Sequence, residues 1–409
     1  MTDTQPHLAQ PPSTPAGRDP DPATVSRTTV TPAAVAEATT RYLGHVAPDT
    51  QDGIGAATWL NVSRFVEATG DTDPLYTDVQ YGAGSVHGTM LAPPTFVLAV
   101  RRPSSSGALD TLPGHDLVER TESMRATWRD RIPLGARLGA RSSLVDVAHE
   151  SGSPATTRIV TETGYTIDGR PIADVGATVA VRERDVPARG IHQYAATDVN
   201  DLVERLENEP SGRGHRPRFW SETEHGESLP ELLKGPLTFS DLFVWTIAEA
   251  RSVQAGNLHL KALSNLPGRL RRNPETGWTR WDRHDAWIDS AASHEGGLGA
   301  PAAPAELVFA LAGQHITHWC GDTGFLWRLR LHLSTPLLYG DCLHLAGRVT
   351  DRWHQEVPGG DEQNAVLLTT SGTNQRGETV FTADATVLLP EPGRFVELPL
   401  TGTPRLRSA

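Results

Sequence analysis

The sequence has little cysteine, no dense basic run and no long hydrophobic run, and each shortage excludes a class of protein. Cys320 and Cys342 are the only cysteines among 409 residues, so a disulfide framework is excluded and a cysteine-based zinc site is disfavoured. The 37 basic residues are outnumbered by 49 acidic ones, for a net charge of -12, which argues against a nucleic-acid partner. Apolar stretches fall short of the ~18 residues that cross a bilayer. With no secretory signal visible, we expect a cytoplasmic protein with no membrane partner.

The remaining composition is typical of a globular protein with more than one core. Hydrophobic residues make up 38% and charged residues 21% of the chain, and the mean hydropathy is -0.35. At ~100–200 residues per domain, this length allows about two to four domains. Residues 1–30 are rich in Pro, Thr, Asp and Ala and contain almost no large apolar side chain. We predict a disordered tail there, and we expect the first 25 or so residues to be dispensable for stability.

The first half of the chain changes from a helical to an alternating pattern. Helices are predicted from Thr31 through Tyr42, over 60–69 and over 95–100, with a loop rich in Gly, Asp and Pro over 70–88. Strands are then predicted over 117–128, 138–148, 156–167 and 170–182. Asp168-Gly169 between the last two strands is a hairpin signal.

The second half repeats this order. We predict helices over 237–253 and 306–319, separated by an irregular stretch, and strands over 326–334, 342–353, 363–373 and 379–389. The segment TETGYTIDGRPIADVGATVAV of the first half matches TTSGTNQRGETVFTADATVLL of the second. A repeat of this length indicates two copies of one fold, packed as an intramolecular pseudo-dimer.

The pattern gives an α+β fold class and a domain plan. We predict a tail over 1–30, an N-terminal domain over 31–185, a linker with one helix over 186–229, a C-terminal domain over 230–390 and a tail over 391–409. A central helix wrapped by an antiparallel sheet is the hot-dog architecture, so a double hot-dog with two such sheets fits, although other α+β units give similar patterns.

Several segments resemble a known family. TWLNVSRFVEATGDTDPLYTDVQYGAGSVHGTMLAPPTF is similar to the N-terminal half of two-domain MaoC-like acyl dehydratases, relatives of the R-specific enoyl-CoA hydratases. KGPLTFSDLFVW, THWCGDTGFLWRL and TNQRGETVFTADATVLLP extend the likeness, which spans roughly residues 50–390. The resemblance implies a double hot-dog fold and reversible addition of water to a 2-enoyl thioester of CoA or a carrier protein.

The resemblance also implies candidate residues in the first half. In this family an Asp and a His share the proton transfers. Asp71 stands at the Asp position, Asp73 replaces the motif Asn, and Tyr76 stands where the His would be. A phenol, with a pKa of about 10 against ~6.5 for imidazole, is a poor base at neutral pH. His87 could enter the pocket as the missing imidazole, or lie in an exposed loop; Asp71 could instead cap a turn.

The reaction also needs a hydrogen-bond donor to the thioester oxygen, on which enolate charge develops. In the family, a backbone N–H at the start of the central helix supplies it. Pro93-Pro94 occupy this position in the first half, and because proline has no N–H, Thr95 offers the first amide. In the second half the Asp and His positions fall on Arg251 and Gly256, so the motif is lost there.

The second-half central helix carries other candidates. Gly313 could present a free amide, and we place His315 and His318, three residues apart, on one side of the helix as substrate-binding residues. A third ligand at helical spacing is missing, so we predict no metal, and no cofactor motif is present.

The sequence therefore predicts a thioester hydratase or dehydratase, a hydro-lyase with a biosynthetic role. Two alternatives stay open: a non-catalytic hot-dog partner subunit, and a natural-product tailoring enzyme that uses the same pocket for another proton transfer. If the chain is a hydratase, we expect Asp71 to act with Tyr76 or His87, with His87 slightly favoured. A homodimer of double hot-dog chains is a further possibility.

Overall fold

The computed structural model describes residues 30–46, 54–101, 117–183, 189–249, 270–272, 276–281, 289–356 and 362–400. Residues 1–29 of the predicted N-terminal tail, Arg251 and Gly256 lie outside these residues. Within them, no helix is both long and apolar enough to cross a membrane.

The first half contains the predicted elements together with several short ones. Its helices are α1 (Pro32–Thr40), α2 (Trp59–Thr69), α3 (Pro74–Thr77), α4 (Val79–Gly84), η2 (Pro94–Phe96) and α5 (Val97–Val100). Its strands are β1 (Leu91–Ala92), β2 (Val118–Trp128), β3 (Ile132–Pro133), β4 (Leu138–Glu150), β5 (Thr156–Ile167) and β6 (Arg170–Arg182). The segment predicted as a loop after α2 holds α3 and α4, because the side chains of Asp73 and Asp78 cap these two short helices.

The linker adds α6 (Ala196–Glu207) and η4 (Trp220–Glu222), and the second half then repeats the first-half order of helices followed by long strands. The second-half helices are α7 (Phe239–Ala248), α9 (Ser290–Glu295) and α10 (Ala305–Cys320). The strands are β7 (Leu232–Lys234), β8 (Leu270–Arg272), β9 (Thr279–Trp281), β10 (Phe325–Leu333), β11 (Leu343–Gln355), β12 (Gln363–Thr373) and β13 (Thr379–Leu388).

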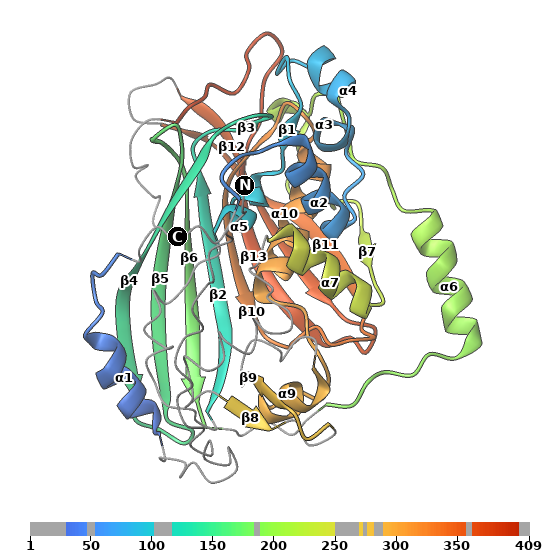
Figure 1. Cartoon of the computed structure of the whole chain (residues 1–409). Coiled ribbons are helices and arrows are strands. Elements are labelled where there is room, and N and C mark those ends of the chain that lie inside the picture. The colour runs from blue at the N-terminus through green and yellow to red at the C-terminus, as the bar shows by residue number, and fades with distance from the viewer. Residues whose placement is uncertain are drawn as a thin grey trace, which may run out of the picture.

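The two predicted antiparallel sheets join edge to edge into one continuous sheet. Its nine strands run in the order β4-β5-β6-β2-β10-β13-β12-β11-β7. Strands β2 and β10 pair antiparallel at the junction, with Ala126 opposite Leu329, and the strands of the two halves continue on either side (Figure 1). Edge-to-edge pairing satisfies the backbone groups that two separate sheets would expose at this junction.

The predicted hairpin between the third and fourth long strands is confirmed. Asp168 and Gly169 both have positive φ, 48° and 83°, and strands β5 and β6 pair antiparallel on either side of them. Two consecutive positive φ values match the twist of the flanking strands, which is why Asp-Gly is favoured in such turns.

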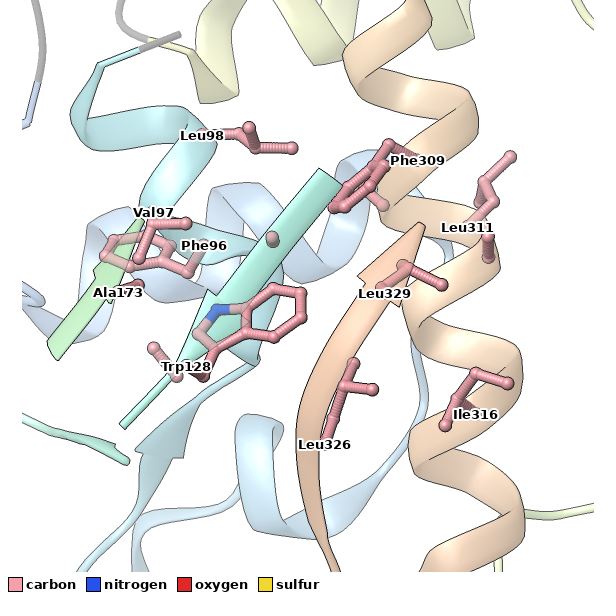
Figure 2. Close-up of a cluster of buried hydrophobic side chains, with 14 of the residues drawn as sticks. Phe96, Val97, Leu98, Trp128, Ala173, Phe309, Leu311, Ile316, Leu326 and Leu329 are labelled. Carbon is pink, nitrogen blue, oxygen red and sulfur yellow. The ribbon is translucent and has the colours of Figure 1, made fainter. Parts of the chain in front are cut away.

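The two central helices are unequal. In the second half α10 is 16 residues long and almost entirely buried, whereas η2 and α5 together cover only residues 94–100. Trp128 of β2 lies between them, with its ring centroid 6.4 Å from that of Phe309 on α10 and its Nε1 donating to the carbonyl of Pro94 (Figure 2). Side chains of both halves thus form one continuous core.

The described part of the predicted C-terminal tail, residues 391–400, packs against the folded domains. The amide of Leu400 donates to the carbonyl of Arg129 at 2.8 Å, and the Leu400 side chain is buried. Leu400 therefore holds the end of this segment against the first half, whereas Glu391 accepts from Ser221 of the linker and Arg394 donates to the carbonyl of Glu362 in the second half.

Candidate functional site

The end of helix α2 places Asp71. Gly70 ends the helix in the left-handed conformation, with φ 58° and ψ 38°, which costs glycine little because it has no Cβ. The amide of Asp71 then donates back to the carbonyl of Val66 at 2.9 Å. This turn directs the Asp71 side chain toward the second half of the molecule.

Asp71 meets a histidine of the other half. Nε2 of His318, in the last turn of α10, lies 2.9 Å from Oδ1 of Asp71. The same carboxylate oxygen accepts the amide N–H of Asp73 at 3.0 Å. The exposed fractions of the two side chains are 2% for Asp71 and 10% for His318, so the carboxylate and imidazole face each other with little competing water. We call these two residues the dyad.

The expected pairing of Asp71 is thereby corrected. We predicted Tyr76 or His87 as its partner and placed His318 among the substrate-binding residues. His87 Nε2 instead lies 2.8 Å from the carbonyl oxygen of Asp322. The imidazole that the motif lacks at Tyr76 is supplied in space by the second half of the chain.

Electrostatics favour a proton on His318. Burial lowers the pKa of His318, but the hydrogen bond and negative charge of Asp71 outweigh burial, so the pKa of His318 is raised overall. In the described part of the chain, Nδ1 of His318 is enclosed and has no hydrogen-bond partner. One ring nitrogen is thus held by Asp71, and the other is buried without a partner among the described residues.

Asp73 adds a second acidic group beside the dyad. Burial, assisted by the charges of Asp71 and Asp322, raises the pKa of Asp73 to about 6, against the opposing effect of the Leu75 amide. Oδ1 of Asp73 accepts that amide N–H at 2.9 Å. We predicted Asp73 as a substrate-binding residue; in the structure it caps α3.

Lys234 and Gln314 support the turn that carries Asp71. Nζ of Lys234 donates to the carbonyl of Gly70 at 3.1 Å. With its amide oriented to satisfy both neighbours, Gln314 donates to the carbonyl of Thr69 at 3.1 Å and accepts from Lys234 at 3.2 Å. Both residues belong to the second half, so that half fixes the Asp71 turn as well as supplying His318.

The linker covers the dyad. The amide of Arg213 donates to the carbonyl of His318 at 3.0 Å. A Cβ added at Gly212 would lie 3.4 Å from Cγ of His318 and 3.6 Å from Oδ2 of Asp73. The linker is therefore part of the wall of the site, not only a connection between domains.

The amide of Gly313 is not the free hydrogen-bond donor that we predicted. Gly313 lies in the interior of α10, where its N–H belongs to the helix ladder and is not free for a ligand. A Cβ at Gly313 would lie 2.6 Å from Cγ2 of Thr95, so Gly313 allows η2 to approach α10 closely. Thr95 itself remains at the start of η2, where first-turn amides lack helical partners.

The two histidines of α10 do not act together. Nε2 of His315 lies 2.8 Å from the carbonyl of Pro230, and its Nδ1 lies 3.0 Å from Oγ1 of Thr370. His315 is 2% exposed, and burial lowers its pKa to about 4. His315 is thus a neutral residue of the core, and in the described chain no three His, Cys, Asp or Glu side chains are arranged to hold a metal.

Comparison with known proteins agrees with this architecture. Residues 44–175 match the family model described as FAS1-like, dehydratase domain region. This match and the fold confirm the resemblance to MaoC-like dehydratases that the motifs indicated. No curated protein matches the chain.

Solved structures share the fold over most of the chain. A MaoC-like dehydratase is 15% identical, with a TM-score of 0.60, over 85% of this chain and 99% of its own. A MaoC domain protein dehydratase from Chloroflexus aurantiacus is 12% identical, with a TM-score of 0.53, over 82% of this chain and 92% of its own. At these identities the likeness establishes the double hot-dog fold.

Proposed function

We propose that the chain catalyses reversible addition of water to a 2-enoyl thioester of CoA or a carrier protein, with Asp71 and His318 as its proton carriers. The observation that carries this proposal is the buried 2.9 Å contact between them. The dehydratase region in the first half and the MaoC-like fold of the whole chain support the reaction class.

Hydration needs one group to take a proton from water and another to give a proton to the α-carbon. The carboxylate of Asp71 is the base, and His318 is the acid, because its raised pKa favours the imidazolium form. In dehydration the two groups exchange these roles. The amide of Thr95 is our candidate donor to the thioester oxygen as enolate charge develops.

This assignment weakens the non-catalytic alternative. That alternative was favoured by the missing motif histidine at Tyr76 and by the loss of the motif in the second half. Since His318 places an imidazole against Asp71, both kinds of proton carrier are present in one chain. The tailoring alternative uses the same pocket for another proton transfer, so the dyad alone does not separate it from the hydratase.

The test is hydration of crotonyl-CoA and longer enoyl-CoA thioesters, followed by loss of the ultraviolet absorbance of the conjugated thioester. Asp71→Asn and His318→Gln should each lower kcat by at least ~100-fold, the typical effect of removing a general acid or base. Matched controls are Asp78→Asn, at the exposed cap of α4, and His294→Gln, on the exposed face of α9. Near-normal turnover in either dyad variant would refute the assignment, and an inactive wild-type protein would favour the partner-subunit alternative.

A further inference from the structure

A small cavity lies between the two halves, and neither Asp71 nor His318 lines it. It has a volume of about 30 Å³, which is room for about two water molecules. Tyr76 and Arg131 line it from the first half, and Thr317 and Cys320, on either side of His318 in the sequence, line it from α10.

Arg131 is held firmly at this cavity. Its Nη2 donates to the carbonyls of Gly324 at 3.0 Å and Thr323 at 3.4 Å. Its guanidinium carbon lies 5.4 Å from the centre of the Phe325 ring. The guanidinium therefore keeps one orientation, set by the segment that follows α10.

The positive charge of Arg131 is not neutralised by an ion pair. The carboxylate of Asp130 accepts from Arg170 at 2.6 Å and from the main chain of Arg131 at 2.8 Å. The carboxylate of Asp322 accepts from the hydroxyl of Tyr81 at 2.8 Å. Across the described residues, no carboxylate lies within ion-pairing distance of the Arg131 guanidinium, and burying an unpaired cation is costly.

Tyr76 supplies a second donor. Burial, together with the charges of nearby acidic groups including Asp73, raises the pKa of Tyr76, so the phenol stays protonated. Its hydroxyl makes no hydrogen bond to any described residue. A fixed guanidinium and a protonated phenol thus border one small space, and both groups donate.

We propose that Arg131 and Tyr76 bind an oxyanion of the acyl substrate, an inference that rests on the proposed function. Two oxygens have this chemistry: the thioester oxygen as it becomes an enolate, and a carboxylate at the far end of the acyl chain. Asp130 and Asp322 also line the cavity and oppose an anion there, although Asp130 is paired with Arg170 and Asp322 accepts from the hydroxyl of Tyr81. In either case the site binds a negatively charged oxygen at the junction of the halves.

Kinetics with two substrates distinguish the two oxygens. Arg131→Met and Tyr76→Phe are compared with wild type on crotonyl-CoA and on the CoA monothioester of fumaric acid. If the site holds the enolate oxygen, kcat falls about 100-fold on both substrates, as for loss of an oxyanion donor. If it holds a terminal carboxylate, only the fumaric thioester is affected, mainly through KM. Unchanged kinetics on both substrates would overturn the proposal.

A binding measurement separates this site from the proposed reaction. Formate, a carboxylate small enough for the cavity, should raise the Tm of the wild-type protein and of Arg41→Met, a surface control on α1, but not of Arg131→Met. Should Arg131→Met fail to fold, Tyr76→Phe takes its place. A wild type that hydrates no enoyl thioester yet shows this pattern would refute the reaction and retain the anion site. An equal or absent formate effect in wild type and variant would refute the site.

Discussion

At the scale of single residues, His315 and His318 show how one helix gives two histidines opposite behaviour. They are three positions apart on α10, yet His315 faces β12 and the carbonyl of Pro230, whereas His318 faces Asp71. Burial without a carboxylate lowers the pKa of His315, and contact with a carboxylate raises that of His318. Residue type and spacing alone therefore do not assign a role to either residue.

The lowered pKa of His315 predicts how stability depends on pH. The unfolded chain, with a histidine pKa of ~6.5, takes up this proton before the folded chain, whose His315 has a pKa of about 4. The free energy of unfolding should therefore fall as pH drops from about 6.5 to 4, by up to about 3 kcal/mol from this residue. His318 acts with the opposite sign, because a raised folded pKa gives stability that is lost as pH rises through it.

Urea unfolding of wild type and His315→Gln across this pH range measures the effect. The variant is less stable at pH 7 but should lose less stability on acidification, because it has no proton to take up at this position. His294→Gln, which changes an exposed histidine, should follow the wild-type curve. Parallel curves for wild type and His315→Gln would contradict a buried neutral His315.

At the scale of secondary-structure elements, the sequence predicted the long helices and strands well. The 2.0 and 3.6 periodicities located β2, β4 to β6 and β10 to β13, and also α2 and α10, close to their observed bounds. The repeat was visible because both halves keep a strand, a turn and a returning strand. Short elements such as α3 and β7 were not predicted, because side-chain capping and pairing at the sheet edge, rather than hydrophobic periodicity, define them.

The candidate site was only half predictable. Asp71 could be found because it lies in a local motif, and the turn after α2 keeps that motif together. Its partner His318 could not be predicted, because it is 247 positions away in the sequence. Only the packing of α10 against α2 brings His318 and Asp71 together. The resemblance pointed to a histidine at position 76 and so directed attention to Tyr76 and His87.

The contact between η2 and α10 gives a prediction about packing. Alanine at Gly313 would gain up to about 1 kcal/mol in helix propensity, but its Cβ would lie 2.6 Å from Cγ2 of Thr95. We expect this overlap to cost about 1–3 kcal/mol, so Gly313→Ala should be destabilising. Thr95→Ser removes Cγ2, and in that background Gly313→Ala should be neutral or stabilising.

A double-mutant cycle in urea measures this coupling. An interaction energy of at least ~0.5 kcal/mol in favour of the double variant is expected, as for residues in direct contact. Simple additivity of the two substitutions would show that η2 and α10 do not meet at Gly313. A catalytic role for the Gly313 amide predicts no such rescue.

At the scale of the whole molecule, the two halves form one structural unit. Strands β2 and β10 join them into a single sheet, one hydrophobic core contains side chains from both, and the dyad takes one residue from each. Separating the halves would open the sheet, expose the core and divide the dyad. The pseudo-dimer is therefore an obligate arrangement, and stability and the proposed function depend on the same junction.

This arrangement predicts that the full chain unfolds in one cooperative transition. Ile172→Ala in β6 and Leu368→Ala in β12 remove fully buried side chains from the first and second halves, and each should cost about 2–5 kcal/mol. If the halves are one unit, each substitution lowers the Tm of the same single calorimetric peak, and the calorimetric and van't Hoff enthalpies agree. Val145→Ala, at an exposed position of β4, should leave the peak in place. Two peaks, of which each core substitution moves only one, would show that the halves unfold independently and that the β2–β10 junction contributes little to holding Asp71 against His318.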